Sequence, residues 1–434
     1  MKNIEFLTLV CLMFICSCTS NKTLWRIQKN GLYGFIDSVG QVIIEPQYQY
    51  VGQFHDGYAC VISSMKMSKD SVLIVKYGYI NVNNEIVIDT VNSLSVKANS
   101  RSGLSKCASQ YANKSFDFRT RIFRKLDLRD DRFLFQDPKT KLFGYKDSEG
   151  NIVVAPKYYE ADAYSYGRAV VTDTVKFDNS KFDITKLMNR TGVIDVDGNV
   201  LVKPKYGLIH NYSKTGKTWA CYFSQDNGDI RKHWVLLDEH GNSLTPSILV
   251  DYIYNNSEDG PYIVVYSDLF GVFYTFVDNN GHYLTDYDHD DEITIISFDE
   301  KMKQETFRDV TAFRNGYAGV RCTYDGHPAW VFVNEQMKSL QWETNSVPYD
   351  SVQNFSEGLA PVKEWVIDEN YPDYRPGKWG YLDIHAKLVI PFSFSECGVF
   401  DGALAYFKNY GSNTDIEGYI DKKGNIVWQA ECSK

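Results

Sequence analysis

Short runs of alternating apolar and polar residues, separated by tight-turn sequences, fill most of this chain. The recurring pattern is an aromatic residue, glycine, an aromatic or aliphatic residue, isoleucine and aspartate, first seen as Tyr33-Gly34-Phe35-Ile36-Asp37. A period of two with aromatic and β-branched residues predicts strands. The glycine position recurs, with substitutions, at 34, 78, 144, 192, 235, 275, 331, 380 and 418. We therefore predict about nine units, each of about 40 residues plus insertions.

The residues after each aspartate predict a hairpin turn. An aspartate side chain accepts hydrogen bonds from the backbone amides that follow it, and a glycine three places later, such as Gly40 after Asp37, adopts the positive φ that closes the turn. These aspartates are Asp37, Asp147, Asp195, Asp238, Asp278, Asp383 and Asp421. Because they recur with the repeat, we assign them to turns and not to catalysis.

The rest of each unit supplies two more strands. An apolar strand follows the turn and is expected to end at a proline, as Val42-Ile43-Ile44 does before Pro46, since proline cannot donate to a sheet ladder. Two aromatic residues six places apart come next, and then a glycine and a strand with a small residue, as in Gly358-Leu359-Ala360-Pro361-Val362. Each unit is therefore predicted to be a three-stranded antiparallel meander.

Together these units predict an all-β array over residues 24–429, with an insertion at 97–130. Three-stranded units and insertions of unequal length favour a curved open stack, or solenoid, in which each unit packs only on its neighbours. A propeller-like ring is the alternative, because radial closure leaves only short sheet edges.

The N-terminus predicts export and lipidation. Residues 6–15 form an apolar run that would span only about 15 Å as a helix, which is too short to cross a membrane and indicates a signal peptide over residues 1–17. Its end, Ile15-Cys16-Ser17-Cys18, resembles a lipobox, which would place the acyl chains on Cys18. Residues 18–23 then form a polar tether. We expect a cell-envelope protein that is lipid-anchored to the outer membrane, facing the periplasm or the outside.

Composition narrows the classes of partner and cofactor. A net charge of −9 argues against nucleic acid as a partner, and 31 Tyr and 25 Phe suit a strand-rich protein. Six cysteines follow Cys18, and none forms a Cys-x-x-Cys pair. We therefore expect small buried thiols in strands and no metal or other cofactor.

Three further segments were candidates for chemistry. Ser63 and Lys66 match Ser-x-x-Lys in a predicted loop but lack the motifs that accompany it in serine hydrolases. The acidic run at 286–292 lacks the glycine and spaced glutamate of a calcium loop, so a solvated insertion is favoured. Basic and apolar residues interleave over 119–129, a pattern that could contact anionic headgroups or a partner. We favour the simpler interpretation, a surface loop or short helix that covers one edge.

The repeat resembles the WG-repeat family, which is named for its Trp-Gly pair. The best copy is Trp379-Gly380-Tyr381-Leu382-Asp383, preceded by Gly358-Leu359-Ala360-Pro361-Val362, and the resemblance extends over about residues 24 to 429. In the other copies Tyr, Phe or Thr replaces the tryptophan, or the glycine is lost. The resemblance implies an all-β array, often in exported or surface proteins, with no general catalytic function and no family active site.

These observations predict a non-catalytic binding or scaffolding lipoprotein of the bacterial envelope. Its partner would be an envelope protein or a glycan, contacted by Tyr and Trp rings of the hairpin rows, although most of these rings are expected in the core. The alternative is an envelope enzyme, such as a glycan hydrolase with a carboxylate pair in an insertion. Acidic residues converging in one pocket away from the repeat turns would favour that alternative.

Overall fold

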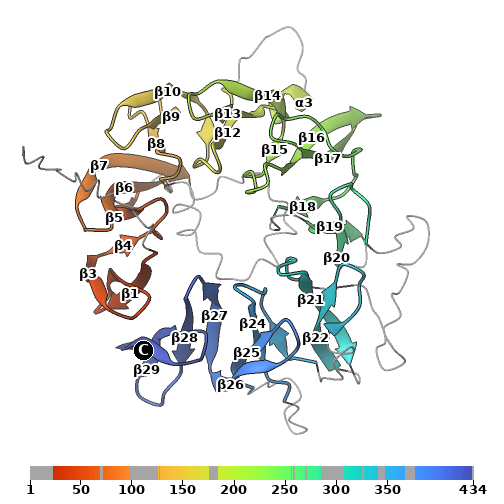
Figure 1. Ribbon diagram of the computed structural model, residues 1–434. Helices are drawn as coiled ribbons and strands as arrows, with labels where there is room; N and C mark the ends of the chain where they lie inside the picture. The colour runs from red at the N-terminus through yellow and green to blue at the C-terminus, as the bar shows by residue number, and fades with distance from the viewer. Residues whose placement is uncertain are drawn as a thin grey trace, which may run out of the picture.

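Nine small antiparallel sheets stand around a common axis in the computed structural model, and we call them blades 1 to 9 in chain order (Figure 1). The structure describes residues 23–68, 72–97, 126, 128–174, 184–255, 257, 260–268, 271–284, 307, 309–324, 327–340, 348–366 and 377–432. None of the helices in this described part is long and apolar enough to cross a membrane.

The strands of the first four blades have the following bounds. Blade 1 is β1 (Trp25–Lys29), β2 (Leu32–Ile36) and β3 (Val42–Tyr48), and blade 2 is β4 (Tyr50–Val51), β5 (Tyr58–Met67), β6 (Val72–Asn81) and β7 (Ile86–Lys97). Blade 3 is β8 (Phe133–Gln136), β9 (Phe143–Lys146) and β10 (Ile152–Tyr158). Blade 4 is β11 (Glu160–Ala161), β12 (Arg168–Thr172), β13 (Thr191–Asp195) and β14 (Val200–Tyr206), with the short helix α3 (Ile184–Met188) between β12 and β13.

The remaining five blades complete the circle. Blade 5 is β15 (Leu208–Ile209), β16 (Thr218–Asp226) and β17 (Asp229–Leu237), blade 6 is β18 (Tyr252–Tyr254), β19 (Tyr262–Asp268) and β20 (Gly271–Val277), and blade 7 is β21 (Tyr317–Tyr324) and β22 (His327–Asn334). Blade 8 is β23 (Ser351–Val352), β24 (Leu359–Lys363), β25 (Trp379–Asp383) and β26 (Leu388–Phe394). Blade 9 is β27 (Glu396–Asp401), β28 (Leu404–Asn409), β29 (Asp415–Ile420) and β30 (Ile426–Cys432).

A complete blade has four strands, one more than the three-stranded prediction. The additional strand lies nearest the axis and comes from the segment between the two spaced aromatic residues; in blade 2 it is β4, where Val51 pairs with Val61 (Figure 1). From the axis outward there follow the strand with the small residue, the Trp-Gly strand and the strand after the aspartate turn. Alternation alone missed the inner strand because only two residues of it pair.

The sequence predicts that the outer strand ends at its proline, and this prediction is wrong. β3 continues through Pro46 to Tyr48, and its pairing with β2 shifts register between Tyr33 and Ile36. The same bulge occurs in blades 3, 4 and 8. A bulge on an edge strand leaves a backbone position without a ladder partner, and proline fits there because it has no amide hydrogen to donate.

The bulge also explains the glycine of the Trp-Gly pair. A Cβ built on Gly380 would lie 2.5 Å from the carbonyl oxygen of Ile390, which is far inside van der Waals contact. The same collision, with a carbonyl of the bulged strand, would occur at Gly34, Gly144, Gly192 and Gly418. Glycine is therefore required where the bulged backbone of the outer strand approaches the backbone of the Trp-Gly strand beside it.

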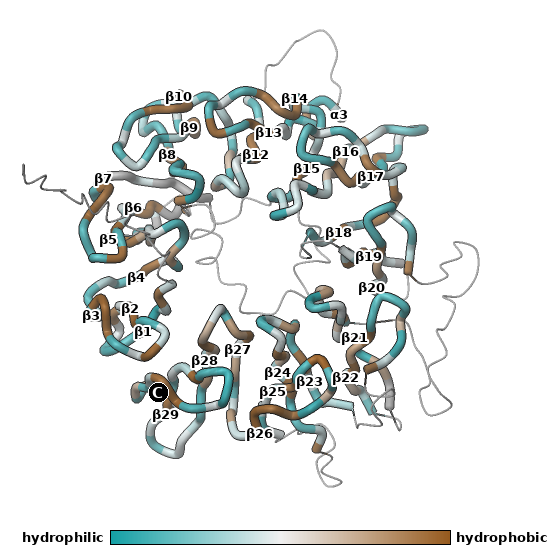
Figure 2. Tube along the Cα trace, viewed as in Figure 1, coloured by the Kyte–Doolittle hydropathy of each residue, from teal (hydrophilic) through white to brown (hydrophobic). Residues whose placement is uncertain are grey.

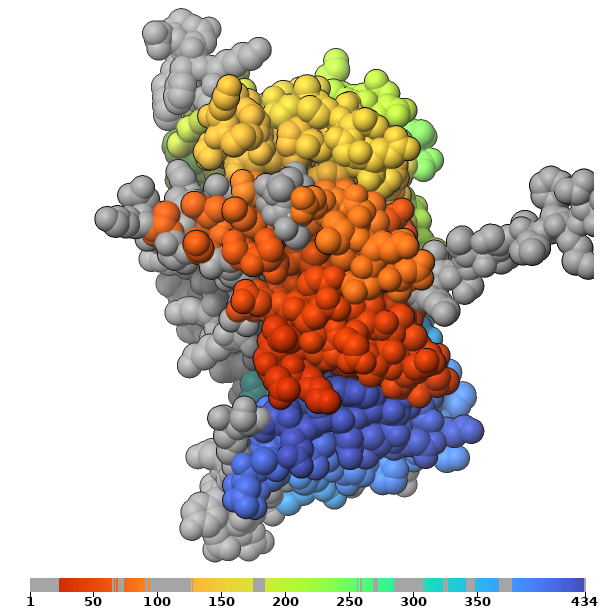
Figure 3. Space-filling view, turned by 90° about the vertical axis from the view of Figure 1, so that its left-hand side faces the viewer, coloured from red at the N-terminus to blue at the C-terminus, as the bar shows by residue number. Residues whose placement is uncertain are grey.

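The array closes into a ring, which was the alternative in the sequence analysis; the favoured open stack is not formed. Blades 1 and 9 are in direct contact (Figure 3). Trp25, Ile27, Ile36 and Leu404 share one buried cluster across this seam, and the indole Nε1 of Trp25 donates to the carbonyl of Asp401 at 2.9 Å. Closure buries the apolar faces that a stack would expose at its two ends.

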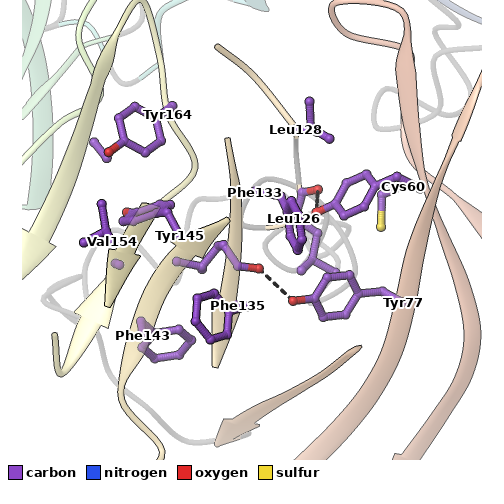
Figure 4. Close-up of a cluster of buried hydrophobic side chains, with 14 of the residues drawn as sticks. Cys60, Tyr77, Leu126, Leu128, Phe133, Phe135, Phe143, Tyr145, Val154 and Tyr164 are labelled. Atoms are coloured by element: carbon purple, nitrogen blue, oxygen red, sulfur yellow. Dashed lines mark hydrogen bonds between the residues drawn. The ribbon is translucent and has the colours of Figure 1, made fainter. Parts of the chain in front are cut away.

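Aromatic side chains pack between neighbouring blades. Apolar residues concentrate on the strands (Figure 2). The second aromatic of each six-residue pair packs on the preceding blade, with ring centroids 4.7 Å apart for Phe35 and Phe54 and 5.1 Å apart for Tyr381 and Phe400. Figure 4 shows such a layer around blades 2 to 4. The six-residue spacing therefore holds successive blades together.

Tyrosine hydroxyls reinforce the same layers. The tyrosine after the Trp-Gly glycine donates to a backbone carbonyl of the next blade, from Tyr145 to Asp162 at 2.7 Å and from Tyr381 to Gly398 at 2.8 Å. At the seam, Tyr419 of blade 9 donates to the carbonyl of Arg26 in blade 1 at 2.7 Å. The ring therefore closes with the same hydrogen bond that joins blades elsewhere.

The ring has two unlike ends. The strand with the small residue begins beside the aspartate that ends the Trp-Gly strand, as in the pairs Arg168 with Asp195 and Leu359 with Asp383. We call the end that carries the aspartate turns the turn face, and the opposite end, where hairpins join the strand with the small residue to the Trp-Gly strand, the hairpin face. Bonds between neighbouring blades, such as that from Arg132 Nε to the carbonyl of Val196, show that the turns lie at one end.

Candidate binding surface

Several residues singled out from the sequence lie outside the described part of the chain. These are the lipidation candidate Cys18, the acidic run 286–292 and most of the insertion at 97–130. Within that insertion, Leu126 and Leu128 are buried in the core of blades 2 to 4, and the hydroxyl of Tyr79 donates to the carbonyl of Leu126 at 2.7 Å (Figure 4).

The repeated aspartates form the turns that the sequence predicted. The Oδ1 of Asp195 accepts from the amides of Asp197 and Asn199, and its Oδ2 accepts from the side chain of Asn199 at 3.0 Å. Partial burial raises the pKa of Asp195, but these hydrogen bonds outweigh it, so its pKa lies below the usual value. The carboxylate is occupied by the turn, and Asn81 does the same without a charge.

Other candidate groups have structural surroundings. Ser63 and Lys66 lie in strand β5, not in the predicted loop, and the Ser63 hydroxyl contacts the carbonyl of Lys76 at 3.5 Å. Cys60, Cys221 and Cys397 are buried, as predicted, and burial raises the pKa of the Cys221 thiol to about 12. Among the described residues, no three His, Cys, Asp or Glu side chains are placed to hold a metal ion.

Among the described residues, most aromatic rings belong to the core, and three tyrosines are about half exposed. Tyr159 is 52% exposed, Tyr410 is 55% exposed and Tyr166 is 47% exposed. Tyr159 and Tyr410 lie on the hairpin face, because each follows the end of a strand there, whereas Tyr166 lies in a loop of the turn face. The guanidinium of Arg190 lies 5.4 Å from the Tyr159 ring centroid, and Lys408 Nζ lies 5.2 Å from that of Tyr410.

The two faces differ in regularity. On the turn face each turn is closed by a bond from the amide three places after its aspartate or asparagine, so these turns have nearly one shape, and the other loops there, such as 162–167, are short. On the hairpin face the connections range from 30–31 between β1 and β2 to 173–190 between β12 and β13 and 364–378 between β24 and β25. Binding residues in repeat proteins concentrate where loops vary, because such loops alter a surface without altering the core.

Blades 5 to 7 break the symmetry of the ring. The glycine is replaced there by Val235, Thr275 and Val331, and the described part of the outer segment forms isolated bridges, such as Trp234 with Ile248 and Leu237 with Ser243, and single bonds such as that from the Leu244 amide to the Leu236 carbonyl. Four buried side-chain atoms without a hydrogen-bond partner lie in blades 5 and 6 or their loops, namely Trp219 Nε1, His233 Nδ1, Trp234 Nε1 and Asn255 Oδ1. Sequence reasoning had noted the lost glycine but had no signal for these buried polar atoms.

Comparison with known proteins gives one family. The WG containing repeat matches residues 33–62, 143–173, 192–222, 349–364 and 379–411. None of these ranges includes a strand of blade 6 or blade 7. No curated protein matches the sequence.

Solved structures with a similar arrangement share little sequence with this chain. A eukaryotic initiation factor has a TM-score of 0.48 at 7% identity and covers 95% of this chain and 97% of its own. Dipeptidyl peptidase 4 of Porphyromonas gingivalis has a TM-score of 0.45 at 7% identity, covering 90% of this chain and 63% of its own. An uncharacterized protein of Listeria monocytogenes has a TM-score of 0.31 at 9% identity, covering 74% and 90%.

Proposed function

We propose that this chain, in which the WG containing repeat is matched at five places, is a non-catalytic binding or scaffolding protein of the bacterial cell envelope. The observation that carries the proposal is the contrast between the two faces. The turn face carries the repeated turns and short loops such as 162–167 and 210–217, while the hairpin face varies from two-residue turns to long insertions. Greater variation on one face of a rigid ring suits recognition of a partner.

The exposed tyrosines supply contact chemistry on that face. A tyrosine ring offers apolar area together with a hydroxyl, and an adjacent cation adds charge, as Arg190 does for Tyr159 and Lys408 for Tyr410. These groups suit a protein surface or a glycan, because both combine apolar patches with hydrogen-bonding groups. The partner class of the proposal is therefore an envelope protein or an envelope glycan.

Matched tyrosine variants test the hairpin face. We expect Tyr159→Ala and Tyr410→Ala to weaken partner binding by about tenfold each, equivalent to about 1.4 kcal/mol. Tyr166→Ala is the control, because Tyr166 is similarly exposed but lies on the turn face. A photo-crosslinking amino acid at each of the three positions in living cells, with a glycan array in parallel, measures the contacts.

The results separate the possibilities. Crosslinks or glycan binding that depend on positions 159 and 410, but not on 166, support the proposal. Equal crosslinking at all three positions contradicts it, and so does turnover of a glycan on the array by the purified chain.

The anchor is a separate part of the proposal. The lipobox-like residues Ile15 to Cys18 support acylation of Cys18, which would hold the ring at a membrane without a membrane-spanning segment. We expect Cys18→Ala to abolish palmitate labelling and to release the protein from the membrane fraction. A Cys18→Ala variant that is still labelled and still sediments with membranes contradicts the anchor.

A further inference from the structure

We infer that the ring is held with its turn face toward the membrane and its hairpin face away from it. This inference rests on the proposed lipid on Cys18, and it adds an orientation that the anchor alone does not specify. It follows from where the described chain begins, how firmly that point is fixed and how short the tether is.

The chain enters the ring on the turn face. Trp25 pairs with Ile36 at the end of the first hairpin, and Asp37, next in sequence, opens an aspartate turn. Leu24 therefore lies beside the turn of blade 1. The opposite end of the same hairpin, at Lys29 and Leu32, lies on the hairpin face.

The entry point is rigidly fixed. Leu24 is 2% exposed and Trp25 is 4% exposed, and the Trp25 indole donates to the carbonyl of Asp401 across the seam. Freeing more chain for the tether would require Leu24 to leave the core of blades 1 and 2 and Trp25 to leave the core of blades 1 and 9. The tether therefore has a definite end at residue 24.

The length of the tether sets the geometry. Cys18 and Leu24 are six positions apart, so the fully extended segment spans at most about 20 Å. The five residues of β1 add about 16 Å between the two faces. To place the hairpin face on the membrane, the tether would have to run the whole height of blade 1, with almost no length left for its own attachment.

The consequence concerns the partner. The hairpin face, with Tyr159 and Tyr410, would look into the aqueous space, so its partner approaches from that side and is not the lipid of the anchoring membrane. The turn face, with its acidic turns and short loops, would lie over the headgroups.

Energy transfer from two sites on one blade tests the orientation. Ser38→Cys places a donor dye on the turn face and Lys29→Cys places it on the hairpin face; both residues are exposed and both belong to blade 1. The background retains Cys18 and the buried Cys60, Cys221 and Cys397, with Cys107, Cys322 and Cys432 replaced by serine. The acylated protein is incorporated into liposomes that carry a rhodamine-labelled phosphatidylethanolamine as acceptor.

We expect clearly stronger transfer from position 38 than from position 29, corresponding to the height of about 16 Å between the two faces. Equal transfer would mean that the ring stands on its edge, and stronger transfer from position 29 would mean the reverse orientation; either result overturns the inference while leaving the anchor intact. A protein that gives no transfer from either site and does not float with liposomes, like the Cys18→Ala control, contradicts the anchor itself.

Discussion

Blade 8 and blade 5 show how one residue decides the form of a repeat. In blade 8, Gly380 lets the bulged strand β26 cross closely over β25, and the carbonyl of Ile390 occupies the space of a side chain. In blade 5 the equivalent residue is Val235, and the outer segment meets β17 only through the isolated bridges of Trp234 and Leu237 and single bonds at Leu236, without forming a regular strand. The difference shows that the outer strand depends on the absence of a Cβ, not on strand propensity.

The comparison also shows what the ring tolerates. Although blades 6 and 7 lack the glycine, they keep the inter-blade aromatic pairs Phe276 with Phe313 and Phe332 with Phe355, each with centroids 4.8 Å apart. The layers between blades therefore hold the ring together even where the outer segment forms no regular strand. Three predictions test this comparison of blades.

The largest effect is expected at the glycine. Gly380→Val should destabilise the protein by about 2–4 kcal/mol, because the new side chain collides with the backbone of β26 and detaches that strand. Urea unfolding measures the loss, and hydrogen exchange of the amides of β26 reports the detachment. Gly358→Ala is the control: a Cβ there meets open space, and only the positive φ of 82° costs stability, at about 1 kcal/mol. If the Gly380→Val variant is as stable as the wild-type protein, the outer strand does not depend on the absence of a Cβ at position 380.

An intermediate effect is expected at the inter-blade tyrosine. Tyr381→Phe should cost about 1–2 kcal/mol, since it leaves the carbonyl of Gly398 without its 2.8 Å hydrogen bond while keeping the ring contact with Phe400. Phe276 is the natural residue at this position in blade 6, so the variant converts one class of blade toward the other. Urea unfolding again measures the change, with Tyr166→Phe as surface control. A loss no larger than that of the control would show that the hydroxyl contributes nothing.

The smallest effect is expected at the turns, where the two classes of blade are alike. The pKa of both Asp195 and Asp238 is lowered: partial burial raises it, but turn hydrogen bonds outweigh that. A carboxylate whose pKa is lower in the folded than in the unfolded protein stabilises the fold at pH values above its unfolded-state pKa of about 4. This contribution is lost as the pH falls through the lower pKa of the folded state. Asp195→Asn and Asp238→Asn should therefore each flatten the acid side of the stability profile slightly and equally. Thermal melts between pH 2 and 7 measure both variants. If the two substitutions change stability by different amounts, the turns of the two classes of blade are not alike.

The sequence predicted the local structure well because the signals there are local. The aspartate turns form as expected, since each closes within a few residues by its own side-chain and backbone bonds, as at Asp195. The prolines were misplaced because a bulge is a property of two paired strands: Pro46 lies inside β3, where register shifts against β2. The inner strand β4 was missed for the same reason, because two residues carry no periodicity.

The candidate surface was less accessible to sequence reasoning. The high tyrosine content indicated aromatic contacts but not which rings are free, and only packing against neighbouring blades separates buried Tyr381 from exposed Tyr410. The sorting of connections onto two faces likewise requires the strand order.

By itself the sequence determined the repeat, its all-β character, its turns and the six-residue aromatic spacing, because each depends on contacts within one unit or with the next. Only the tertiary structure decided that nine units close into a ring, with Trp25 and Tyr419 joining the ends. Closure depends on the sum of small rotations between blades, which the packing of every aromatic layer sets together. No single copy of the motif contains that sum, which is why the same pattern was compatible with both a stack and a ring.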